Sequence, residues 1–168
     1  AWQTDDADRL SEELGRLERA FDLILIDTGA GISTKVTDFV LASDRAFIVA
    51  TPEPTSIADA YAMVKVATSD RPDLPVGLIV NRAKSPREAH ELHTKFEEIT
   101  KRFLNIQIDR IGHVVEDLEI EHATRNQNPV VVSEPETEAA RCLKKLGEEL
   151  LGDLDATDRS QPGLFERL

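Results

Sequence analysis

Residues 21–33 read FDLILIDTGAGIS, and this stretch decides the fold class. Its core, Leu23–Ile26, is apolar at every position and is followed by Asp27, Gly29 and Gly31. A strand that is half exposed alternates apolar and polar residues, whereas a continuous apolar run is typical of a strand buried on both faces of a parallel sheet. The stretch therefore predicts a buried parallel strand that ends in a glycine-containing loop.

Three later stretches carry the same signature: Ala46–Ala50, Val76–Val80 and, more weakly, Ile106–Val115. Apolar residues spaced three and four apart predict helices at 10–21, 57–67, 89–103 and 139–150. Strands that alternate with helices define an α/β fold with a mainly parallel, doubly wound sheet. We expect all four predicted strands to lie in this one sheet.

The composition excludes several other classes of protein. The chain has 168 residues, 40% of them hydrophobic, which argues against both a membrane bundle and a disordered tail. Its 20 basic and 32 acidic side chains give a formal charge of −12, which makes DNA an unlikely partner. A single cysteine, Cys142, excludes a disulfide framework and fits a reducing cytosol. All apolar runs are too short to span a bilayer.

The residues that follow each predicted strand are candidates for a site, because ligands bind beyond the carboxyl ends of the strands in an open parallel sheet. Asp27 follows the first strand, and its carboxylate is suited to holding a hydrated Mg²⁺. Gly29 and Gly31 leave backbone amides free to face an anion. The alternative is structural: Asp27 caps the next helix and the glycines only form a tight turn.

The second predicted strand leads into a proline-rich loop. Pro52 and Pro54 stiffen this loop, and Ser56 and Asp59 have the spacing of a capping box at the start of a helix. A rigid turn without a ligand is the alternative interpretation. The loop contains Thr51, Pro52, Glu53, Pro54, Thr55 and Ser56.

The third predicted strand is followed by Asn81 and Arg82. An asparagine amide can pair with both the donor and the acceptor edge of adenine. A guanine site would favour a carboxylate three residues later, where this chain has Lys84. The sequence therefore favours adenine as the base.

The remaining reactive side chains give weaker signals. His90 and His93 are three residues apart, unlike the HExxH zinc pattern, and are expected on the polar face of a helix. His113 and His122 have no evident partners. Cys142 is expected to be a small core residue.

Together these motifs resemble the MinD/ParA family of deviant P-loop ATPases, and within it the flagellar-number regulator branch FlhG (also called FleN or YlxH). Residues 21–33 resemble its Walker B and switch II segment, and residues 50–63 its next loop and helix. Residues 80–83 resemble the adenine-contacting segment. The similarity continues through residues 126–130 to about residue 151, so it covers most of the chain.

The chain departs from the family pattern in two places. Val115 stands where the family has a proline in its Ile-Pro-x-Asp motif. No glycine is followed by lysine, so the Walker A loop is missing. The resemblance therefore implies a P-loop NTPase sheet truncated at its N-terminus, with residues 1–152 forming the C-terminal part of a MinD-like ATPase domain. It also implies that a membrane-targeting helix ends family members. The loosely attached acidic tail, 153–168, places Leu164, Phe165 and Leu168 on one potential face of such a helix, and a frayed terminus is the favoured alternative.

The resemblance implies a function as well: an ATP-dependent homodimer that docks on the cytoplasmic membrane and controls flagellar placement or number. ATP and Mg²⁺ would be its cofactors, and a flagellar GTPase or flagellar assembly proteins its partners. Asp27 would serve Mg²⁺ through water, and Thr51–Ser56 would relay the nucleotide state to partners. By the same resemblance, the γ-phosphate would lie by Gly29 and Gly31, and the base by Asn81, Arg82 and Glu116.

No catalytic residue is expected within the chain, so we expect it to be inactive when it is not joined to a P-loop segment. Two alternatives remain. One is a non-enzymatic partner-binding module derived from such an ATPase. The other is a ParA-type cargo or DNA segregation factor, which the charge of −12 disfavours.

Overall fold

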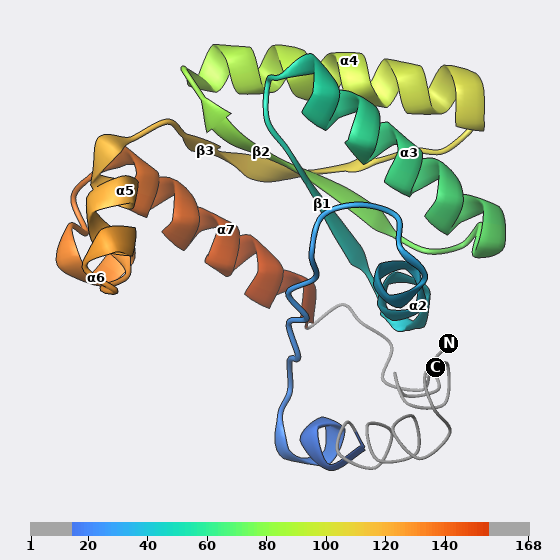
Figure 1. Cartoon of the computed structure of the whole chain (residues 1–168), viewed down its shortest axis with the longest axis horizontal. Coiled ribbons are helices and arrows are strands. Elements are labelled where there is room, and N and C mark those ends of the chain that lie inside the picture. The colour runs from blue at the N-terminus through green and yellow to red at the C-terminus, as the bar shows by residue number, and fades with distance from the viewer. Residues whose placement is uncertain (1–14, 155–168) are drawn as a thin grey trace.

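The computed structural model describes residues 15–154, which form an α/β fold around a parallel sheet (Figure 1). Residues 15–20 are helical and precede the labelled elements. No helix within 15–154 is long and apolar enough to cross a bilayer. The elements are α2 (Thr34–Ala42), β1 (Ala46–Ala50), α3 (Pro54–Asp70), β2 (Val76–Ala83), α4 (Pro86–Leu104), β3 (Asp109–Val115), α5 (Leu118–Arg125), α6 (Val130–Ser133) and α7 (Glu138–Leu154).

The sheet has the strand order β1-β2-β3, and both pairings are parallel. β1 spans the predicted residues, with Ala46 opposite Val76 and Ala50 opposite Val80. β2 continues beyond its predicted end to Ala83. These three strands confirm the predicted α/β class with its parallel sheet.

Helices cover both faces of the sheet (Figure 1). On one face α3 and α4 enclose the larger core, in which Val64, Leu78 and Phe96 are at most 1% exposed. On the other face α7 packs against β3, with Ile111 and Leu146 in a second apolar cluster. The continuous apolar run of β2 follows from this arrangement, because both of its faces are buried, whereas β1 buries Ala46, Ile48 and Ala50 and leaves Val49 57% exposed.

The prediction of a strand at Leu23–Ile26 is wrong. These residues form irregular chain, and Leu23 and Leu25 are 38% and 64% exposed. A strand forms only where a neighbour satisfies its backbone groups. A cavity of about 1030 Å³, lined by both Leu23–Ile26 and β1, separates this segment from the sheet. Ile26 still packs against Phe39 and Ala42 of α2.

Periodicity did not predict α2, α5 or α6, which are short. α2 is held at its C-terminal end by Arg71, whose Nη1 donates to the carbonyl oxygens of Leu41 (2.8 Å) and Ser43 (2.5 Å). These are carbonyls that a helix end leaves without partners. At the other end of the chain, α7 continues to Leu154, past the expected boundary at 152, and the expected membrane-targeting residues of the tail lie outside the described residues.

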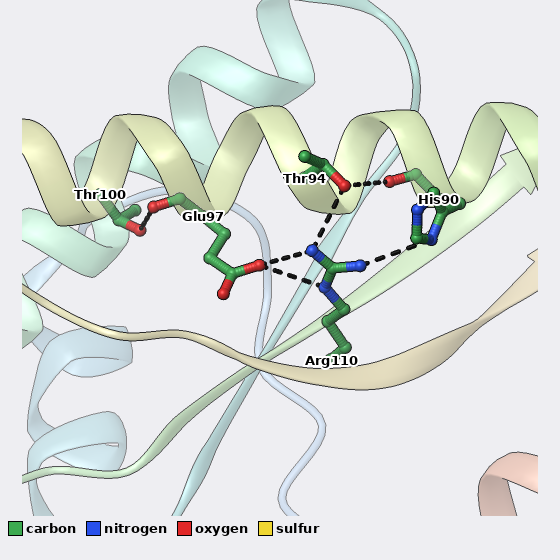
Figure 2. Close-up of polar contacts among 5 residues, drawn as sticks. All are labelled: His90, Thr94, Glu97, Thr100 and Arg110. Carbon is green, nitrogen blue, oxygen red and sulfur yellow. Dashed lines mark hydrogen bonds and ion pairs between the residues drawn. The ribbon is translucent and has the colours of Figure 1, made fainter.

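The outer strand β3 carries charged side chains at its start. The guanidinium of Arg110 binds Glu97 Oε2 through Nε (3.2 Å) and Nη2 (2.6 Å). It also contacts Thr94 Oγ1 (3.2 Å) and His90 Nδ1 (3.4 Å), so that one arginine joins β3 to three residues of α4 (Figure 2). Charged residues on an outer strand discourage pairing with another chain.

His93 lies in the core, which corrects its expected place on a polar helix face; His90 is exposed as expected. His93 is 6% exposed, and its Nε2 lies 3.1 Å from the carbonyl oxygen of Gly112 in β3. Burial lowers the pKa of His93 below its ordinary value, an effect that the bond to Gly112 opposes and the nearby Arg110 reinforces. The neutral ring is thus part of the packing between α4 and β3.

The close approach of β2 and β3 gives a packing prediction. A Cβ added at Gly77 would lie 2.5 Å from Ile111 Cγ1, so Gly77→Ala overpacks the sheet and should lower the free energy of unfolding by about 1–3 kcal/mol. Gly147, in α7, has open space around it, and Gly147→Ala should instead stabilise the protein by about 0.5–1 kcal/mol. Urea denaturation of both variants measures these changes. Equal changes in the free energy of unfolding for Gly77→Ala and Gly147→Ala would contradict this packing.

Stability should also depend on pH through His93. Because its folded-state pKa is lowered, the unfolded chain takes up a proton first as the pH falls through about 6.5, and the free energy of unfolding should decrease. His93→Gln should flatten this part of the profile, measured by urea denaturation between pH 8 and 5. A slope that His93→Gln leaves unchanged would contradict this account.

Candidate functional site

The candidate residues gather at the carboxyl edge of the sheet. Thr51 follows β1, Asn81 lies in the last part of β2, and Glu116 follows β3. All three strands are parallel, so these positions share one edge. Asp27 has no strand of its own and lines the large cavity, as does Ser56. The sheet therefore brings Thr51, Asn81 and Glu116 to one edge.

A β-bulge shapes the end of β2. Val80 lies opposite His113 and Ala83 opposite Val115, so β2 carries one residue more than β3 between these pairs. Arg82 within the bulge has φ +57°, a left-handed conformation that is uncommon for a residue with a side chain. The Asn81 side chain supports this turn, since its Oδ1 accepts the Arg82 amide at 3.0 Å. Bulges of this kind redirect side chains near sites.

Arg82 joins the ends of β2 and β3. Its Nη2 donates to Glu116 Oε1 at 3.0 Å, and both side chains are at least half exposed. This hydrogen bond and the charge of Glu116 raise the pKa of Arg82 above its ordinary value, and Glu53 and Glu121 add to the effect. An ion pair this exposed contributes little to stability. The ion pair instead fixes where the Arg82 guanidinium lies, next to Glu116 at the ends of β2 and β3.

The loop between β1 and α3 is held by Ser56. Its hydroxyl oxygen accepts the amide of Thr51 at 2.9 Å. The predicted capping box of Ser56 and Asp59 is wrong, because α3 begins at Pro54 with Glu53 as its N-cap, and Glu53 makes no side-chain cap. Pro54 has no N–H, so the first turn of α3 has one fewer backbone donor that needs a partner. The Ser56 hydroxyl accepts the Thr51 amide in the loop instead.

The loop that contains Asp27, Gly29 and Gly31 lies exposed at the mouth of the cavity. The N-cap of α2 is Ser33, so Asp27 does not cap that helix, as the structural alternative had suggested. Gly31 has φ +97°, a conformation that favours glycine. Gly31 thus forms a turn between Asp27 and α2.

Oxygen-bearing side chains from two elements line the cavity. Asp27 and Thr28 line it from one side, and Thr55, Ser56 and Asp59 line it from α3. Residues 15–154 contain no cluster of three metal-ligating side chains. Mg²⁺ is usually held by one or two carboxylates together with waters and phosphate oxygens. Asp27 therefore fits a water-mediated role with this ion.

Sequence reasoning missed the contacts that give the site its shape. The bulge at Asn81 and Arg82 depends on the register of β2 against β3, which no local pattern of residues reveals. The role of Asp117 was also missed: it is the N-cap of α5, and its Oδ1 accepts the Glu119 amide at 3.0 Å. An aspartate directly before a helical segment is a signal that could have identified this cap.

The chain has relatives among bacterial regulators of flagella. It is 32% identical over 129 residues to the antiactivator FleN of Pseudomonas aeruginosa, an alignment that covers 77% of this chain and 46% of FleN. It is 32% identical over 108 residues to the flagellum site-determining protein YlxH of Helicobacter pylori, covering 64% of this chain and 36% of YlxH. The chain thus spans less than half the length of these relatives. No protein-family profile matches it.

Solved structures of MinD share the fold. The cell-division ATPase MinD of Pyrococcus furiosus matches with a TM-score of 0.66 and 26% identity, covering 90% of this chain and 63% of the MinD chain. MinD of Pyrococcus horikoshii, solved in complex with Mg-ADP, also matches with a TM-score of 0.66, at 24% identity, and shows the fold alone; the match covers 94% of this chain and 65% of that one.

The fold and these relatives support one class: the chain is similar to the MinD/ParA type of deviant P-loop ATPases. Within that class it is similar to the FlhG branch, which contains FleN and YlxH.

The Ser56 contact gives a prediction about the loop. Ser56→Ala removes the acceptor of the half-buried Thr51 amide, so the free energy of unfolding should fall by about 1 kcal/mol and exchange of that amide should become faster. Ser69→Ala removes an exposed hydroxyl that bonds only its own helix and should change stability by less than about 0.5 kcal/mol. Urea denaturation and amide exchange by NMR check both. An unchanged Thr51 exchange rate in Ser56→Ala would refute the assignment.

Proposed function

We propose that the chain is the C-terminal part of a MinD-like ATPase that controls flagellar placement or number through ATP-dependent dimerisation and membrane docking. The observation that carries the proposal is the shared carboxyl edge of the parallel strands, which holds the Asn81–Arg82 bulge and Glu116, with the Asp27 loop lining the cavity beside β1. The similarity to FleN and YlxH supports the flagellar role.

The base would bind at the end of β2. Asn81 Oδ1 already accepts the Arg82 amide, which orients the side chain and leaves its NH₂ group to donate to a ring nitrogen of adenine. A carbonyl oxygen has a second lone pair, so Oδ1 can also accept from the exocyclic amino group. The Arg82 guanidinium, held by Glu116, offers a planar surface beside the base.

The phosphates would bind at the Asp27 loop. Mg²⁺ supplies positive charge to the phosphate oxygens when it is bound, and Asp27 would hold it through water. The turn at Gly29 and Gly31 would let backbone amides approach the γ-phosphate. Among the described residues that line the cavity, the sole cationic side chain is Arg45, at the amino end of β1. Phosphoryl transfer depends on positioning and charge neutralisation, so a lysine from outside these residues is needed.

The second candidate function is a partner-binding module without enzyme activity. The acidic and hydroxyl lining of the cavity around Asp27 and Asp59, with no lysine among the described lining residues, favours it. In that case Thr51–Ser56 would serve as a docking loop, stiffened by two prolines and by the Ser56 hydrogen bond. Flagellar assembly proteins or a flagellar GTPase would be the partners under either proposal, at the cytoplasmic face of the membrane.

The nucleotide proposal predicts weak binding by the isolated chain. Without a lysine-bearing phosphate loop, the 168-residue chain should bind MgATP more weakly than millimolar and show no turnover above a buffer blank. Calorimetric titration and phosphate release measure the two quantities. Micromolar binding, or turnover that Asp27→Ala abolishes, would show that the chain holds a complete site.

A chimera tests whether the chain binds ATP and controls flagellar number when it is joined to a P-loop. The 129 matched residues of Pseudomonas aeruginosa FleN are replaced by those of this chain, which supplies the P-loop from FleN. The chimera should bind MgATP in preference to MgGTP and restore the normal number of flagella in cells that lack FleN. Asn81→Ala should weaken ATP binding by about tenfold, the loss of one good pairing to the base, whereas exposed Lys95→Ala in α4 should not. A chimera that restores flagellar number without binding nucleotide would favour the partner-binding module.

A further inference from the structure

The bulge at the end of β2 is clamped on both of its sides. Val80 and Ala83, which flank it, are both 0% exposed, and both are paired with residues of β3. The amide of Glu116 also donates to the Ala83 carbonyl oxygen at 2.8 Å. A residue in an uncommon backbone conformation persists only where its surroundings determine that conformation. Here the sheet on either side holds Arg82 at φ +57°.

The turn that follows the bulge is fixed by α4. Glu88 Oε2 accepts the amide of Lys84 at 2.6 Å, and the Glu88 amide donates to Ser85 Oγ at 3.2 Å. These reciprocal bonds tie the first turn of α4 to the chain that leaves β2. The backbone around Arg82 is thus held by β3 on one side and by α4 on the other.

The Arg82 amide determines which way the Asn81 carboxamide faces. It donates to Asn81 Oδ1 at 3.0 Å. An N–H group needs an acceptor, and the nitrogen of a carboxamide is only a donor. Turning the carboxamide over would therefore remove this hydrogen bond and bring two donors together. The side chain consequently presents its acceptor and its donor in a fixed order.

A fixed order of acceptor and donor distinguishes two kinds of purine. Adenine carries an exocyclic amino donor next to a ring-nitrogen acceptor, which matches Oδ1 and the NH₂ group of Asn81. Hypoxanthine and guanine carry an oxygen acceptor at the place of that amino group, and this oxygen would face Oδ1. A carboxamide turned over would pair with such an oxygen, but the bond to the Arg82 amide opposes that change.

We propose that the left-handed backbone of Arg82, by fixing the Asn81 carboxamide, makes this site select a purine with the amino group of adenine over one with an oxygen at the same place. Arg82 is then a positioning residue that acts through Asn81. The inference rests on the proposed nucleotide function. It assigns base selectivity to a backbone conformation, and not to the Arg82 guanidinium that lies beside Glu116.

Two substitutions separate the backbone of Arg82 from its side chain. Arg82→Gly and Arg82→Val both remove the guanidinium. Glycine adopts the left-handed conformation without strain, whereas the β-branched valine disfavours it. Arg82→Gly should therefore keep the Asn81 carboxamide fixed, and Arg82→Val should release it.

The fixed carboxamide is measurable by NMR in the 168-residue chain without nucleotide. Relative to the intrinsic rate of each residue, exchange of the residue 82 amide should be about fivefold slower in the unmodified chain and in Arg82→Gly than in Arg82→Val, because one hydrogen bond is lost. Asn81→Ala removes the acceptor and should also give the faster rate. Equal protection in Arg82→Gly and Arg82→Val would overturn the proposal, whatever the nucleotide affinities are.

The selectivity itself is measured in the FleN chimera by calorimetric titration with MgATP and with Mg-bound inosine triphosphate (ITP), which carries hypoxanthine. ATP should bind at least about tenfold more tightly than ITP, the value of one good pairing to a base. Arg82→Gly should weaken the binding of both nucleotides and keep this preference. Arg82→Val should make the two affinities nearly equal.

Each other outcome of the titration has a separate meaning. A preference that both variants lose would assign the selectivity to the guanidinium, and one that both keep would show that the backbone conformation has no effect; either result overturns the proposal. If the unmodified chimera binds ATP and ITP equally, the inference is wrong while the proposed nucleotide function stands. If it binds neither nucleotide, the proposed function is wrong and the inference is wrong with it.

Discussion

The parallel ladder of β1, β2 and β3 is the constraint on which the rest of the structure depends. β2, paired on both sides, fixes the two neighbouring strands in register, and their shared direction places all three carboxyl ends at one edge. Burial of both faces then requires a helical layer on each side, which α3 and α4 supply on one face and α7 on the other. Thr51, Asn81 and Glu116 are positioned by the ends of these strands. Asp27 lies in the loop that lines the cavity beside β1.

The regular part of the ladder gives stability, and its irregularities provide the features of the site. The bulge at Asn81 and Arg82 breaks the register of β2 at the very edge where ligands bind in such folds. Arg82 tolerates a left-handed backbone there because the Asn81 side chain and the Glu116 carboxylate hold it from two directions. A side chain also holds the end of β1, since Ser56 Oγ accepts the amide of Thr51 directly after the strand.

The sequence predicted those elements whose pattern depends on local burial. β1 was predicted to the residue, and the apolar spacing located α3, α4 and α7, because each of these buries a continuous run or stripe. Leu23–Ile26 has the same apolar signature as β1 but lacks a pairing neighbour among the described residues, and apolar character alone does not make a strand. The same limit applies to His93: its helical position was predictable, whereas its burial against Gly112 depends on how α4 is rotated on the sheet. The shared edge of Thr51, Asn81 and Glu116 was predictable because strand direction in a parallel sheet follows from topology, whereas the bulge depends on register and was not predicted.

The central claim is that the carboxyl edge of this sheet forms the base-binding half of a MinD-type nucleotide site. Photocrosslinking with 8-azido-ATP in the FleN chimera tests it most directly, with the labelled segments identified by mass spectrometry. The account predicts labelling confined to residues 81–84 and 116–121, competed by ATP and reduced by Asn81→Ala. Labelling of α4 or α7, or of the amino edge of the strands, would contradict it.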